Sequence, residues 1–144
     1  MLPFGRIELK GQKSKPFAEQ PATLGEHLRK RRLELGLFQR EVAKLLASDP
    51  HSITEWEKDR AKPGIRFWPA IIAFLAYDPH PEPMTLGERL RVKRRALGLS
   101  IADAAARMGV DEGTFGKWER GTGDPIRKHV GVATRFLRAT PDAL

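Results

Sequence analysis

The stretch QREVAKLLASDPHSITEWEKD, from Gln39 to Asp59, has the pattern of two short apolar helices around a turn. The chain repeats this pattern 62 residues later, as IADAAARMGVDEGTFGKWERG from Ile101 to Gly121. The same offset pairs TLGEHLRKRRLELGL (23–37) with TLGERLRVKRRALGL (85–99), where ten of the fifteen positions are identical. Because apolar residues fall on apolar residues and turns on turns, the repeat marks a duplicated structural unit.

The repeat predicts how the 144 residues are divided. Residues 1–21 show no helical period and are expected to form an N-terminal arm. Residues 22–79 and 85–144 are expected to be two small domains, and the proline-rich segment 80–84 is expected to link them stiffly. Apolar residues recur at helical spacing in both domains, so the predicted class is all-α, with five short helices in each.

Helix boundaries carry recognisable signals. Thr23 followed by Glu26 has the pattern of a capping box, and Gly36 is a predicted helix end. Asp49 is a predicted N-cap, with Pro50 at the first helical position, where a missing N–H costs nothing. The second domain repeats the capping pattern at Thr85 with Glu88 and at Ser100 with Asp103.

The two central helices of each domain have the small residues that a steep crossing needs. Ala43 and Ala105 are expected where the helix backbones approach each other. Gly109 suits a turn position with a positive φ, and Ala47 in the first domain would adopt that φ at a cost of about 1 kcal/mol. This is the helix-turn-helix arrangement, whose second helix can enter the major groove of DNA.

At these residues the sequence resembles a known family. Both domains are similar to the Cro/phage-repressor (Xre) type of helix-turn-helix domain over residues 23–77 and 85–138, and the run GLFQREVA…ITEWEKDRAKP is typical of it. The resemblance implies a bundle of five helices that binds double-stranded DNA. It also implies that Gln39, at the start of the second helix, contacts a phosphate or a base.

One arginine interrupts the apolar stripe of the first helix in each domain. Arg32 and Arg94 lie at core spacing, and a buried guanidinium without a partner costs several kcal/mol. Glu57 and Glu119, which follow the core tryptophans, are the predicted partners. The family resemblance implies the same pairs, and their predicted role is structural.

The remaining candidate contacts with DNA follow from the predicted third helix. Polar side chains on its free face are expected to meet base edges, and nearby cations are expected to hold phosphates. The predicted base-reading face is Pro50, His51, Thr54, Glu55 and Lys58, and the predicted backbone contacts are Arg40, Arg60, Lys62, Arg66, Lys117, Arg120, Arg127 and Lys128.

The second domain departs from the family pattern. Ile101 replaces the glutamine, and Gly113 and Gly116 fall on the expected reading face, where they have no side chain to read with. The first domain is therefore expected to read bases. The second is expected to clamp the backbone or to contact a protein.

Composition excludes several other classes. The net charge of +8 suits a polyanion such as nucleic acid, and the chain has no cysteine, in keeping with a reducing cytoplasm. The four histidines are scattered singly, so no metal site, cofactor or catalytic constellation is predicted. No segment has the length or hydropathy of a signal peptide or a membrane span.

The sequence therefore predicts a cytoplasmic DNA-binding protein that acts as a transcriptional regulator, without enzymatic activity and without a small-molecule effector. The alternative is a protein-interaction module, an antitoxin or an assembly adaptor that keeps the fold with little contact to DNA. Its partner would then be a second copy of the chain or a different protein. Salt dependence separates the two, because phosphate contacts weaken with salt.

Overall fold

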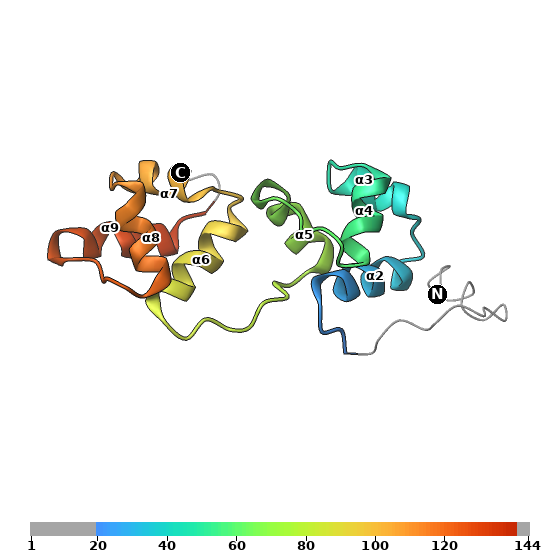
Figure 1. The fold of residues 1–144 in the computed structure, drawn as a ribbon, viewed down its shortest axis with the longest axis horizontal. Helices are drawn as coiled ribbons and strands as arrows, with labels where there is room; N and C mark the ends of the chain where they lie inside the picture. Colours follow the sequence, from blue (N-terminus) through green and yellow to red (C-terminus); the bar gives the residue numbers. More distant parts are fainter. Residues whose placement is uncertain (1–19, 141–144) are drawn as a thin grey trace. The chain divides into compact units, whose positions relative to one another are not determined.

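A computed structural model describes residues 20–140, and every regular element in that range is a helix (Figure 1). The chain divides into two compact units, Met1–Pro79 and His80–Leu144, called here unit one and unit two. Most of the predicted N-terminal arm lies outside the described residues. Between residues 20 and 140, no helix has the length and apolar character needed to cross a membrane.

The described part of unit one packs four α-helices and one short 3-10 turn around a small core. Helix α2 contacts both α4 and α5, and α3 packs on α4. The centre of the core is formed by Leu28, Ile53 and Ile71, which are almost fully buried. The elements are α2 (Leu24–Glu34), α3 (Gln39–Leu45), α4 (Pro50–Glu57), the 3-10 turn η1 (Ile65–Phe67) and α5 (Trp68–Leu75).

Unit two, as described up to residue 140, repeats this arrangement with four α-helices. Helix α6 contacts α8 and α9, and α7 packs on α8. Leu90, Phe115 and Ala133 lie in its core at the positions equivalent to Leu28, Ile53 and Ile71. The elements are α6 (Leu86–Ala96), α7 (Ile101–Met108), α8 (Glu112–Arg120) and α9 (Arg127–Arg138).

Unit one has five helical elements when the short 3-10 helix η1 is counted, whereas four helices are described in unit two up to residue 140. The segment between α4 and α5 contains Pro63 and Gly64 and forms only the three-residue turn η1. A 3-10 turn has poorer hydrogen-bond geometry than an α-helix and is rarely longer than this. In unit two the equivalent segment leads to α9 without a separate helix.

The predicted helix boundaries are largely confirmed. Thr23 and Thr85 each form a complete capping box with the glutamate three residues later. Asp49 is the N-cap of α4, with Pro50 in its first turn. Ser100 accepts a hydrogen bond from the Asp103 amide, which supplies the N-cap half of the box expected there.

The turn between the two central helices is the same in both units. Gly109 has a φ of 68°, and Ala47 adopts a similar φ of 53° although it carries a side chain. A matching hydrogen bond follows each, from the Ser48 amide to the Ala43 carbonyl at 2.8 Å and from the Val110 amide to the Ala105 carbonyl at 3.0 Å. Unit one therefore closes the turn at the cost of a strained alanine.

Candidate nucleic-acid interface

Helix α4 of unit one is held by one apolar face and by its N-cap. Ile53 and Trp56 are buried, which leaves the opposite face free. The Asp49 carboxylate accepts hydrogen bonds of 2.8 Å from both the amide and the hydroxyl of Ser52. These bonds hold the pKa of Asp49 below its ordinary value of 3.8. The carboxylate is thus engaged in capping the helix.

A buried ion pair joins the end of α4 to α2. Arg32 Nε donates to Glu57 Oε2 at 2.6 Å, and the Arg32 terminal nitrogen Nη2 donates to Glu57 Oε1 at 2.9 Å. The side chains are 14% and 4% exposed, respectively. Arg32 also donates to the Leu37 carbonyl at 3.2 Å. The guanidinium is therefore satisfied within the fold, which is a structural role.

Unit two contains the same pair with an additional cation beside it. Arg94 donates to the two carboxylate oxygens of Glu119 at 2.6 and 3.1 Å. Arg91, which is about half exposed, places its Nε 3.7 Å from Glu119 Oε1. Glu119 is therefore flanked by two guanidinium groups.

In unit one, hydrogen bonds extend from the ion pair to the surface of α4. Gln39 Nε2 donates to Glu57 Oε1 at 3.2 Å, and Gln39 Oε1 accepts from the Thr54 hydroxyl at 2.7 Å. The Thr54 hydroxyl oxygen also lies 3.0 Å from the Pro50 carbonyl oxygen, and its single proton is shared between these two acceptors. The side-chain amide of Gln39 is thus fixed in orientation, while one N–H and one oxygen lone pair are not used by these bonds.

The other candidate residues of unit one lie on the surface around this network. Glu55, which is expected to face a base, places its Oε1 3.6 Å from Arg60 Nη1, so the two charges partly neutralise each other. Arg40 lies over the Phe38 ring, and Arg66 lies over the Phe67 ring. The exposed residues among the candidates are Pro50, His51, Lys58, Lys62, Arg40, Arg60 and Arg66.

The candidate cations of unit two are exposed, but the surface of α8 differs from expectation. Lys117, Arg120, Arg127 and Lys128 are all exposed. Gly116, expected on an open reading face, is buried. The reason is that Arg120 folds over it, and a Cβ at Gly116 would lie 3.0 Å from a terminal nitrogen of that arginine.

Three features of the interface have only weak signals in the sequence. Asp59 accepts hydrogen bonds from the Thr23 hydroxyl at 2.6 Å and the Gly25 amide at 3.0 Å, which ties the start of α2 to the end of α4. Gly25 and Gly87 lie against backbone carbonyls at the ends of α4 and α8, where a Cβ would not fit. A glycine two residues after a capping threonine, at the same place in both repeats, is the signal that identifies these two glycines.

Residues 85–144 match the family model described as a helix-turn-helix domain. The matched range covers α6 to α9, including the capped helix α8 and the Arg94–Glu119 pair. Comparisons with curated proteins and with solved structures give no match. Within the described residues, no group of three or more His, Cys, Asp or Glu is arranged to hold a metal ion. The match supports a helix-turn-helix family, and such a domain suggests a DNA-binding regulator.

Proposed function

We propose that this protein is a sequence-directed DNA-binding transcriptional regulator with two helix-turn-helix units of the Xre type in one chain. The observation that carries the proposal is the α3–turn–α4 arrangement of unit one. It shares its register, its left-handed turn and its buried Arg–Glu pair with the region that matches the family model. A duplicated unit doubles the contact with DNA without requiring a second chain.

We assign base reading to unit one because its recognition surface is preorganised. Thr54 and Glu57 fix the amide of Gln39 before any ligand arrives. A glutamine amide can pair with adenine through one donor and one acceptor, and Gln39 keeps one of each. His51 on α4 and Lys58 at the C-cap of α4 are exposed and supply further donors.

Unit two is assigned mainly to the DNA backbone. Ile101 and Gly116 occupy the positions of Gln39 and Thr54, so the hydrogen-bonded reader is missing there. Four exposed cations remain on α8 and in the first turn of α9, and cations contact phosphates without regard to sequence. They are Lys117, Arg120, Arg127 and Lys128.

The test is DNA binding by the full chain, measured by fluorescence anisotropy at several salt concentrations with a selected site and with random DNA. His51→Ala with Thr54→Ala should reduce discrimination between the two by about 1–3 kcal/mol per lost base contact. Lys117→Ala with Arg120→Ala should weaken binding to both DNAs equally and reduce the salt slope by about 1 to 2.

Two further variants complete the experiment. Gln39→Ile gives unit one the residue found in unit two and should also lower discrimination. Arg89→Ala removes an exposed cation on α6 that is outside the proposed interface, and it serves as the control. A change of base preference in the unit-two variant would contradict the assignment of roles.

A protein-interaction module is the second candidate, and the acidic groups around the recognition helices favour it. Glu55 is held near Arg60, and Asp49, Asp111 and Glu112 stand at the starts of α4 and α8. These carboxylates oppose the approach of phosphate. If no DNA binding is found at low salt, this reading replaces the first.

A further inference from the structure

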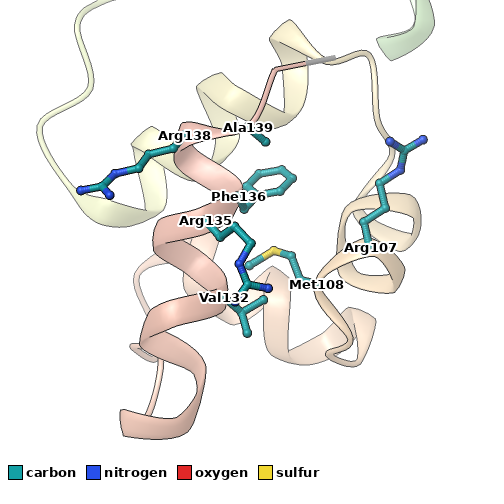
Figure 2. A pocket seen from close by; sticks show the side chains of 7 residues that line it. All are labelled: Arg107, Met108, Val132, Arg135, Phe136, Arg138 and Ala139. Atoms are coloured by element: carbon teal, nitrogen blue, oxygen red, sulfur yellow. The ribbon is translucent and has the colours of Figure 1, made fainter. Parts of the chain in front are cut away.

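A hollow of about 320 Å³ lies between α7 and α9 of unit two, away from the surface of α8 assigned to DNA (Figure 2). Its floor is apolar and is built from the buried residues Met108, Phe136 and Ala139, with Val132 beside them. This volume is at the small end of the range for ligand sites, so it suits one large apolar group.

Three arginines surround this apolar floor. Arg107 comes from the end of α7, and Arg135 and Arg138 come from the last turns of α9. All three are exposed, and none has a hydrogen-bond or ion-pair partner among residues 20–140. In Figure 2, Arg107 and Arg138 stand on opposite sides of the hollow, with Phe136, Met108 and Ala139 between them.

The fold does not require these arginines, as unit one shows. The repeat places Leu45, Ala73 and Ala76 at the positions of Arg107, Arg135 and Arg138. It also places Tyr77 at the position of Ala139. In unit two, the small side chain of Ala139 forms part of the floor. Unit two therefore combines an open apolar floor with three charges that its counterpart lacks.

We propose that this hollow docks a short acidic segment of a partner protein, with one large apolar side chain on the floor and flanking carboxylates at the arginines. Guanidinium groups bind carboxylates through paired, charge-assisted hydrogen bonds. Because the arginines stand on opposite sides of the floor, an extended peptide can reach them together. Duplex DNA offers phosphates, but its apolar contact in the major groove is a thymine methyl, which is smaller than the large apolar group that the floor suits.

The test measures binding of a labelled, acetylated octapeptide to the full chain by fluorescence anisotropy. The peptide has a single phenylalanine between aspartates and glutamates. Saturable binding is expected. Replacing the phenylalanine by serine, or the acids by lysines, should abolish it. Arg107→Glu with Arg135→Glu should weaken binding at least about tenfold, since it reverses both charges.

Two variants separate the pocket from general charge effects. Ala139→Tyr keeps all three arginines but places a large side chain at a buried residue of the floor, so it should fill the hollow and weaken binding by about tenfold or more. Arg127→Glu changes a cation at the other end of α9, outside the hollow, and should change binding by less than about threefold.

Three results would overturn the proposal. The first is no binding up to about 1 mM peptide, or binding that neither the arginine variant nor Ala139→Tyr changes. The second is a loss of DNA affinity in Arg107→Glu with Arg135→Glu, which would make the arginines DNA contacts. The third is self-association that Ala139→Tyr abolishes in sedimentation, which would make a second copy the occupant. DNA binding itself is measured independently, so either proposal can fail alone.

Discussion

Units one and two keep the same buried ion pair but connect it to different surroundings. In unit one, the Glu57 carboxylate also accepts from Gln39, which in turn holds the Thr54 hydroxyl at the surface of α4. In unit two, Glu119 instead has a second cation, Arg91, at 3.7 Å. The two units therefore share the ion pair that closes the fold, and they differ in the residues between this pair and the surface of α4 or α8.

Removing the arginine of each pair gives the largest expected effect and tests this difference directly. Arg32→Ala leaves the Glu57 carboxylate buried with only the neutral Gln39 amide, and should lower the stability of unit one by about 3–5 kcal/mol. Arg94→Ala should cost unit two less, because Arg91 still lies near Glu119. Native-state amide hydrogen exchange, followed separately in each unit, measures both values.

The control is Arg60→Ala, which removes an arginine that is 62% exposed and 3.6 Å from its partner. It should cost less than about 1 kcal/mol, since exposed pairs contribute little. If Arg32→Ala and Arg94→Ala lower the free energy of unfolding equally, Arg91 does not compensate for the loss of Arg94. The different surroundings of the two ion pairs would then make no difference to stability.

The second prediction concerns the glycine that lies two residues after each capping threonine. A Cβ at Gly25 would lie 2.5 Å from the Trp56 carbonyl oxygen and 2.6 Å from that of Glu57, and Gly87 faces the equivalent carbonyls. Backbone atoms cannot rotate away, so Gly25→Ala and Gly87→Ala should each destabilise their unit by about 1–3 kcal/mol. This outweighs the gain of about 1 kcal/mol that alanine gives inside a helix.

Gly64→Ala is the matched control, because nothing lies within 4 Å of a Cβ at that position and its φ is −65°. It should be neutral or raise stability by about 0.4–1 kcal/mol. Thermal unfolding of the three variants is sufficient for the comparison. A stable Gly25→Ala variant would mean that α2 and α4 are not packed as closely as described.

The third prediction exchanges the turn residues of the two units. A Cβ at Gly109 would meet nothing within 4 Å, so Gly109→Ala tests backbone conformation alone. It should cost about 1 kcal/mol, because alanine disfavours the left-handed region. Ala47→Gly should relieve the strained φ of 53° and recover part of that amount in unit one. Chemical denaturation of both variants gives the two values. Effects of the same sign would contradict the shared turn geometry.

The smallest expected effect is the acid dependence of the two helix caps. The pKa of Asp49 and the pKa of Asp111 are both lowered in the folded protein, from an ordinary value of 3.8. Each carboxylate therefore stabilises the fold above pH 3.8, and this contribution is lost as the pH falls below that value. Asp49→Asn and Asp111→Asn should flatten the decline in melting temperature on acidification.

The causes of the two shifts differ, which makes the units distinguishable. For Asp49 the backbone amide of Ser52 acts most strongly on the pKa, whereas for Asp111 the hydroxyl of Thr114 does. Thr114→Ala should therefore reduce the acid dependence of unit two more than Ser52→Ala reduces that of unit one. A larger effect of Ser52→Ala would mean that the backbone amide of Thr114, and not its hydroxyl, mainly lowers the pKa of Asp111.

Much of the fold was predictable because its signals are local. Thr23 with Glu26 specifies a helix start within four residues, and the capping box forms there. Gly109 likewise predicts a left-handed turn from its residue type alone, and the repeat places Ala47 at the same position in unit one. The expected five helices in unit two are not established, because the segment after α8 leads to α9 without a separate helix in the described residues, and apolar spacing does not reveal this.

The candidate site was harder to predict than the fold. Thr54 and Glu55 look like free side chains on a helix surface, but their partners Gln39 and Arg60 come from outside α4. Arg120 bends over Gly116, a contact that helical spacing permits but does not specify. Exposure of a polar group depends on such neighbours, and periodicity alone does not identify them.

The sequence by itself determined the repeat register, the helix class, the main helix caps and the left-handed turns at Gly109 and Ala47. Each of these depends on steric and hydrogen-bonding preferences of residues a few positions apart. Only the tertiary structure decided that Gln39 links Glu57 to Thr54, that Gly25 lies against the carbonyls of α4, and that Arg107 and Arg135 border one apolar hollow. These contacts join separate helices, and their distances are fixed by how the core packs.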